Sequence, residues 1–234
     1  MYFIILLMID AAAGFLSALP FLIILEILAR RQIPALPLRH LIGDGIFCFF
    51  LSAILSVTGI PAVYELKPGI NINLIPFADL ASNTLQYAEN LLLFLPVGFL
   101  LPVLFPHFRN ALRCVRYGFF FSLAVELMQL FCLRATDIDD LIMNTLGCAA
   151  GYGLFLLLQN LCPALAQNFA PLHTVNENAA EACPSGQIRR CNKKEPPALL
   201  KLEAHFLTAA SWAGGLLLTP AIKELIWGIL TLSV

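Results

Sequence analysis

The densest group of side chains capable of chemistry lies in one short stretch of a largely apolar chain. Residues 123–144 read LAVELMQLFCLRATDIDDLIMN, in which four carboxylic acids, two amides and one guanidinium interrupt two hydrophobic runs. Carboxylates act as general acids or bases and bind hard cations through oxygen, and a guanidinium matches phosphate geometry. The candidate functional residues of this stretch are Glu126, Gln129, Arg134, Asp137, Asp139, Asp140 and Asn144.

The acidic triplet Asp137, Asp139 and Asp140 has two interpretations. Its oxygens could coordinate Mg²⁺ or Ca²⁺, which makes all three residues candidate metal ligands. Thr136-x-x-Asp139 also resembles a capping box, and acids in the first turn of a helix complement its dipole. Because the pattern provides no further ligand group, we favour a helix start over a metal site, although both roles can coexist.

The composition places these residues in a membrane protein. Of the 234 residues, 59% are hydrophobic and only 12% are charged, whereas about 25% of residues are charged in ordinary soluble domains. Apolar runs long enough to cross a bilayer are predicted at about 2–29, 41–60, 86–106, 117–133 and 138–158. The sequence therefore predicts an all-α, polytopic transmembrane helical bundle with five or six spans.

Three regions of different character follow from this pattern. Residues 1–159 form the predicted five-span membrane domain, and 160–204 form a polar segment that we expect to be flexible. Residues 205–234 contain a further apolar run, which we interpret as a sixth span or as a helix in the membrane interface. The N-terminal run is too long for the hydrophobic core of a signal peptide, so we expect it to remain as a span.

The distribution of basic residues predicts the orientation. Eleven of the 14 Lys and Arg residues lie in 30–40, in 107–116 and after residue 159, up to Lys201. Because basic loops stay in the cytoplasm, we expect a multi-pass protein of the cell membrane with an extracytoplasmic N-terminus and a cytoplasmic 160–204 segment. The 61–85 and 134–137 connections then lie outside.

This orientation brings polar side chains from four spans to similar depths. At a helical rise of 1.5 Å per residue they lie about 6–12 Å below the outer surface, and they are Asp10, Asn90, Glu126, Gln129 and Asn144. Residues 137, 140, 144, 147 and 151 also share one helix face. Gly147 and Gly151 form a G-x-x-x-G pattern that permits close helix packing, within the chain or in an oligomer.

Two of the candidate residues keep alternative roles. Glu126 is the candidate catalytic residue, and we favour a functional role for it because intramembrane acids are costly and usually functional; the alternative is a packing role with hydrogen bonds to Gln129 or Asn144. Arg134 could pair with a nearby acid or contact an anionic lipid headgroup. We predict a ligand-binding crevice lined by Asn90, Glu126, Gln129, Arg134, Asp137, Asp140 and Asn144.

Several motifs of this region resemble the VanZ-like family. They are N90-LLL-F94-L-P96-V-G98, S122-LAV-E126-LM-Q129, D137-I-D139-D140-LIM-N144-TL-G147-CAA-G151-Y152 and, in the preceding loop, N73-L74-I75-P76-F77. The resemblance covers about residues 70–158. It implies a membrane protein of the cell envelope, with antibiotic resistance to glycopeptides such as teicoplanin as the associated phenotype, and a 73–77 loop that covers the site.

Three functions remain open at this point. The favoured one is binding of, or action on, a lipid-linked cell-envelope component such as a cell-wall precursor. An enzyme on lipid-linked phosphates would use Glu126 as general base and Asp137 and Asp140 as metal ligands. A structural or assembly protein would use the polar residues only to join helices.

The remaining residues indicate little further chemistry. The sequence requires no cofactor and indicates no nucleic-acid partner, and its seven cysteines form neither a zinc pattern nor a disulfide framework. The four histidines fall at or beyond the predicted cytoplasmic ends of spans. Near the same surface we expect Glu26 to pair with Arg30 and Asp44 to be partly solvated.

Overall fold

The computed structural model describes residues 2–32, 38–59, 72–77, 84–131, 136–162 and 198–232. Within these ranges the fold is all-α, as predicted. Its α-helices are α1 (Tyr2–Gln32), α2 (Leu38–Val57), α3 (Thr84–Leu104), α4 (Ala111–Gln129), α5 (Ile138–Leu161), α7 (Ala198–Ala213) and α8 (Thr219–Leu232). Short elements complete it: η2 (Pro106–Arg109), the π-helical turn η5 (Gly214–Leu218), and the two-residue strands β1 (Ile72–Asn73) and β2 (Thr136–Asp137).

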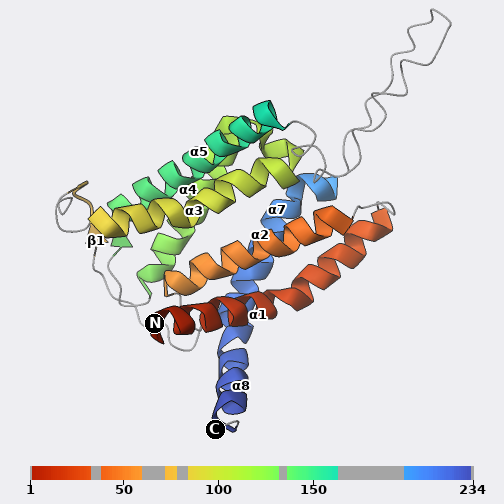
Figure 1. The fold of residues 1–234 in the computed structure, drawn as a ribbon, viewed down its shortest axis with the longest axis vertical. Helices are drawn as coiled ribbons and strands as arrows, with labels where there is room; N and C mark the ends of the chain where they lie inside the picture. Colours follow the sequence, from red (N-terminus) through yellow and green to blue (C-terminus); the bar gives the residue numbers. More distant parts are fainter. Residues whose placement is uncertain are drawn as a thin grey trace, which may run out of the picture.

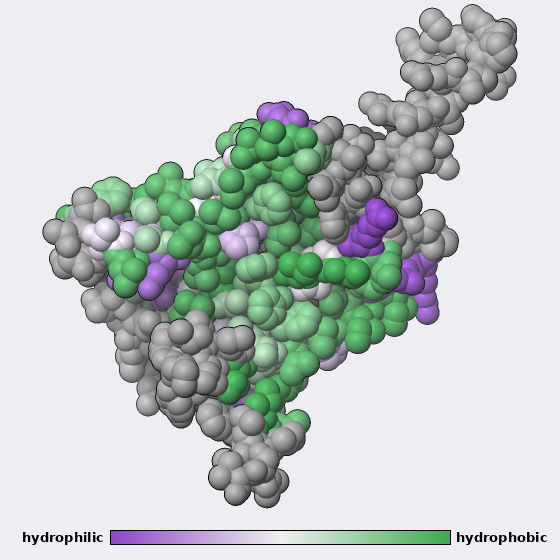
Figure 2. Space-filling view, viewed as in Figure 1, coloured by the Kyte–Doolittle hydropathy of each residue, from purple (hydrophilic) through white to green (hydrophobic). Residues whose placement is uncertain are grey.

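Four of these helices are long and apolar enough to cross a membrane, by the windows Ala11–Leu28, Leu38–Val57, Thr84–Leu104 and Ile138–Leu161. The fourth predicted span corresponds to α4, which has 19 residues but includes Arg113, Arg116 and Glu126. Figure 2 shows a broad hydrophobic surface over the helices, with most of the hydrophilic residues gathered at its two ends. This distribution is the one that a bilayer requires of a helical bundle.

Among the five predicted spans of the membrane domain, the largest difference from the predicted boundaries is at the start of α4. The helix begins six residues before the predicted span, because Asn110 accepts a hydrogen bond from the Arg113 backbone N–H at 3.2 Å and caps it. Arg113 and Arg116 therefore lie in the first turns of α4 rather than in a loop. The helix also ends at Gln129, so Glu126 lies about one turn from its end instead of about two.

Helices α3 and α5 pack at very short distance because glycines replace side chains between them. A Cβ atom added to Gly147 would lie 2.2 Å from the Leu91 carbonyl oxygen, and one added to Gly151 would lie 2.1 Å from that of Leu95. The glycine face of α5 is thus occupied by α3 of the same chain. The predicted close packing is confirmed for this pair, and the oligomer through the same face stays an untested prediction.

The C-terminal apolar run forms a helix that crosses the others. Figure 1 shows α1–α5 running side by side, whereas α7 passes behind α2 and α1 and α8 extends beyond them. Gly214 permits close approach to α1, since an added Cβ would lie 2.7 Å from the Ser17 carbonyl carbon, and Thr219 donates a hydrogen bond to the Ser17 hydroxyl at 3.1 Å. The helix begins at Ala198, inside the segment predicted to be flexible.

Candidate functional site

The predicted polar residues gather where α3 and α5 begin and α4 ends. We call this group the mouth cluster; its members are Asn73, Gln86, Tyr87, Asn90, Ser122, Glu126, Gln129, Asp137, Asp139, Asp140 and Asn144. Three helices contribute to it because α3 and α5 run parallel and α4 runs against both (Figure 1). The sequence-based grouping of residues from spans three, four and five is therefore reproduced in space.

A short strand pair attaches the 72–77 turn to the cluster. Strands β1 and β2 pair in parallel, with Ile72 opposite Thr136 and Asn73 opposite Asp137. The Asn73 side-chain amide donates to Asp137 Oδ2 at 3.3 Å, and the Ile75 backbone N–H donates to Asn73 Oδ1 at 3.2 Å. The turn predicted to cover the site thus contacts it through Asn73.

Asp139 holds the far end of this turn. Its carboxylate accepts the Phe77 backbone N–H at 2.8 and 3.0 Å and the Tyr87 hydroxyl at 2.8 Å, and the residue is 1% exposed. Phe77 has a φ of 57°, which is uncommon for a bulky residue and costs on the order of 1–3 kcal/mol. A buried carboxylate that accepts its N–H offsets this strain and keeps the turn in place.

Asp140 connects α5 to α3. Its Oδ1 accepts from the side-chain amides of Asn90 at 2.5 Å and Gln86 at 3.1 Å. Asp137 is the N-cap of α5, because its side chain accepts the Asp139 backbone N–H at 3.0 Å. The predicted helix start is confirmed, but the capping residue is Asp137 and not Thr136.

Glu126 contacts the chain just before α5. Its Oε2 accepts the Asp137 backbone N–H at 3.1 Å, its carbonyl oxygen accepts the Thr136 hydroxyl at 3.0 Å, and the residue is 3% exposed. Gln129 and Asn144, the partners considered from sequence, bond elsewhere. The Gln129 amide donates to the Thr58 carbonyl at 3.1 Å, and that of Asn144 donates to the Ser122 hydroxyl at 2.9 Å.

Two acceptors in the cluster have no hydrogen-bond partner within the described part of the chain. These are Gln129 Oε1 and Asn144 Oδ1, in residues that are 6% and 2% exposed. Buried polar atoms are normally paired, so each is a place where a donor is missing. Among the predicted site residues, Arg134 lies outside the described residues, and Asp10 lies in α1 but its side chain is not described.

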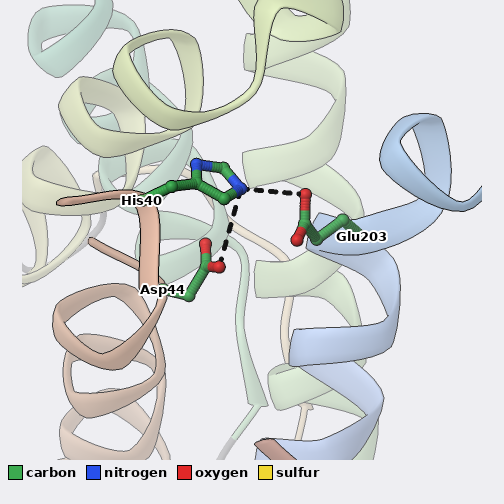
Figure 3. Close-up of side chains that lie close together, drawn as sticks. All are labelled: His40, Asp44 and Glu203. Atoms are coloured by element: carbon green, nitrogen blue, oxygen red, sulfur yellow. Dashed lines mark hydrogen bonds and ion pairs between the residues drawn. The ribbon is translucent and has the colours of Figure 1, made fainter. Parts of the chain in front are cut away.

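A second polar group lies at the other end of α2 and was not predicted. His40 Nε2 is 3.2 Å from Glu203 Oε2 and 3.6 Å from Asp44 Oδ2, and the three side chains converge from α2 and α7 (Figure 3). We call them the buried triad. Asp44 is 1% exposed, so the expectation that it is partly solvated is wrong, because α7 covers it. The signal in the sequence was the i, i+4 spacing of His40 and Asp44.

The predicted ion pair between Glu26 and Arg30 on α1 is confirmed, with Arg30 Nε 2.6 Å from Glu26 Oε1.

The two polar groups differ in how their carboxylates are engaged. Those of Asp137, Asp139 and Asp140 accept from protein N–H and O–H donors. Among the described residues, His40, Asp44 and Glu203 alone form a group of three potential ligands whose atoms lie within 4.8 Å of one another. The mouth cluster is thus connected through hydrogen bonds, and the buried triad is the arrangement with the geometry of a metal site.

Comparison with known proteins agrees with the motifs of the mouth cluster. Residues 45–159 match the family model described as VanZ/LLP1. The chain is a VanZ-like membrane protein. No curated protein and no solved structure matches it.

The matched range separates the two polar groups of this VanZ-like protein. It includes every residue of the mouth cluster, from Asn73 to Asn144. It excludes His40, Asp44 and Glu203, which lie before and after it. The mouth cluster thus lies within the region shared with the family, and the buried triad lies outside it.

Proposed function

We propose that this VanZ-like protein binds the polar part of a lipid-linked cell-envelope component at the mouth cluster. The observation that carries the proposal is the pair of buried, unpartnered amide oxygens of Gln129 and Asn144. They accept hydrogen bonds, so the matching ligand carries donors such as the hydroxyls of a sugar or the amides of a short peptide. Lipid-linked precursors of the cell envelope combine such groups with an acyl or prenyl chain.

The surroundings of the cluster support a ligand that enters from the membrane. Apolar side chains exposed on the helices beside it include Leu92 on α3, Leu127 on α4 and Leu146 on α5, which are 62%, 51% and 49% exposed. A lipid chain would contact such a surface while its headgroup contacts the polar residues. The predicted orientation places this end of the bundle outside the cytoplasm, the side on which glycopeptides meet their cell-wall targets.

A structural role is the second candidate, and one observation favours it. The carboxylates of Asp137, Asp139 and Asp140 are engaged by donors of the same chain. Groups engaged in this way join α3, α5 and the 72–77 turn without any ligand. The enzyme hypothesis, with Glu126 as base and Asp137 and Asp140 as metal ligands, requires divalent-dependent turnover that Asp140→Asn abolishes.

Binding and structural roles are tested with a double variant. Glu126→Gln with Asn144→Ala removes one carboxylate, one unpartnered acceptor and the hydrogen bond from Asn144 to Ser122. Glu89→Gln, which changes an exposed carboxylate of α3, is the control. Purified proteins would be titrated with a lipid-linked disaccharide–peptide in detergent, with binding followed by the shift of the unfolding midpoint. We expect the shift in the native chain and in Glu89→Gln, and its loss in the double variant.

The opposite outcomes are equally informative. An unchanged midpoint shift in the double variant, or no shift in the native chain, contradicts the binding proposal. Lost expression or helix packing without any ligand effect in the native chain supports the structural role. Teicoplanin susceptibility of cells that express the native chain or the double variant tests the resistance phenotype separately.

A further inference from the structure

We propose that His40, Asp44 and Glu203 form a binding site for one divalent transition-metal ion, with Zn²⁺ as the reference ion. The site lies at the opposite end of α2 from the mouth cluster, about 27 Å away along the helix axis. It shares no residue with the proposed ligand site, so the proposal is independent of the proposed function.

The donor set matches the ion. One imidazole nitrogen and two carboxylates are ligands that Zn²⁺ accepts, whereas Mg²⁺ and Ca²⁺ prefer oxygen alone. In a tetrahedral site with bonds of about 2.1 Å, neighbouring ligand atoms are about 3.4 Å apart. The separations of 3.2 Å from His40 Nε2 to Glu203 Oε2 and of 3.6 Å to Asp44 Oδ2 are close to this value.

The hydrogen bonding of the triad leaves acceptors for a cation. Within the described residues, both oxygens of Asp44 and Oε1 of Glu203 have no hydrogen-bond partner, and both residues are 1% exposed. Isolated buried carboxylate oxygens are costly, and they are normally paired or coordinate metals. In the part of the chain that the structure describes, no hydrogen-bond donor is available for these three carboxylate oxygens, and an imidazole lies beside them. We therefore expect the group to bind a divalent cation.

The position of the triad between α2 and α7 indicates a structural effect of the bound ion. His40 and Asp44 come from consecutive turns of α2, and Glu203 comes from α7 on the opposite side of the site (Figure 3). Three protein ligands leave one tetrahedral position for water or an anion. The ion would therefore attach α7, and with it the C-terminal helices, to α2.

A surface groove lies two ring contacts away from His40. A groove of about 500 Å³ between α4 and α7 includes Phe108 and His205 among its lining residues. Phe108 stacks edge-on against Phe105, which stacks edge-on against His40. The proposal therefore requires that the Phe105 and Phe108 rings move to let the ion pass.

The test measures zinc bound by the purified, tag-free full chain in detergent. After removal of metal with a chelator, Zn²⁺ is added in competition with a chromophoric chelator, and the bound ion is counted by mass spectrometry. We expect one tightly bound ion per chain. Asp44→Asn and Glu203→Gln keep side-chain volume and should weaken binding by more than the roughly 10–100-fold that loss of an outer partner costs.

Two exposed residues provide matched controls. His205→Gln removes a histidine on the same helix as Glu203, and Glu224→Gln removes a carboxylate of α8; both should bind zinc as the native chain does. A zinc-dependent rise in the unfolding midpoint of the native chain should be absent in Asp44→Asn.

X-ray absorption of the zinc-bound native chain keeps the test decisive even if a variant does not fold. We expect only nitrogen and oxygen neighbours at about 2.0–2.2 Å. Sulfur neighbours at about 2.3 Å would assign the ion to cysteines and overturn the proposal. No retained zinc, or equal affinity in the native chain and Asp44→Asn, would overturn it as well and identify the triad as a histidine held by two acids.

Discussion

Replacement of Gly151 by alanine tests the close packing of α3 on α5. The added Cβ would lie 2.1 Å from the Leu95 carbonyl oxygen and 2.8 Å from the Phe99 backbone nitrogen. Carbon–oxygen contacts between packed backbones are about 3.3 Å or longer. Because both partners are backbone atoms, no side chain can rotate away, and the helices must separate by about 1 Å.

The cost can be compared within the same helix. Forcing an extra methyl group into a packed interface destabilises by about 1–3 kcal/mol. Gly153, two residues further along α5, has nothing within 4 Å of an added Cβ. Gly153→Ala should therefore be neutral or gain up to about 1 kcal/mol from the better helix propensity of alanine. The two variants add the same atoms and differ only in what those atoms meet.

The assay is the free energy of unfolding of both variants in the same detergent, with the thermal midpoint as a second measurement. Separation of the helices should also lengthen the hydrogen bond from Asn90 to Asp140, so any ligand shift should weaken in Gly151→Ala alone. Equal stability of Gly151→Ala and Gly153→Ala would refute the packing described here. It would place the glycine face of α5 toward lipid or a partner chain.

Two further predictions concern the chain around the mouth cluster. Asp139→Asn keeps the side-chain volume but loses a charged acceptor of the Phe77 N–H and the Tyr87 hydroxyl, so we expect about 2–4 kcal/mol of destabilisation; an unaltered unfolding midpoint would contradict this account of the turn. A Thr136→Cys variant, in a cysteine-depleted background, should react with a membrane-impermeant maleimide in intact cells. Reaction only after permeabilisation would invert the predicted orientation and remove extracytoplasmic precursors as ligands.

Local patterns allowed much of the membrane domain to be predicted. Helices α2, α3 and α5 begin and end within three residues of the predicted spans, because hydropathy over one bilayer thickness is a property of consecutive residues. The shared face of Asp140, Asn144, Gly147 and Gly151 follows from helical periodicity in the same way. The early start of α4 was not predicted. Arg113 and Arg116 were assigned to a loop because they are basic, whereas Asn110 caps the helix before both of them.

Hydropathy and helical spacing could not specify which polar groups form hydrogen bonds with each other. Glu126 accepts the backbone N–H of Asp137 rather than the amides considered for it, and Phe77 reaches Asp139 across 62 residues. His40 and Glu203 are 163 residues apart and meet only because α7 crosses α2. The sequence by itself determined which segments enter the membrane and which faces are polar or small, since these depend on neighbours along one helix. The tertiary structure alone decided the partners, because a buried carboxylate or imidazole takes its partners from whatever packing brings within about 3 Å.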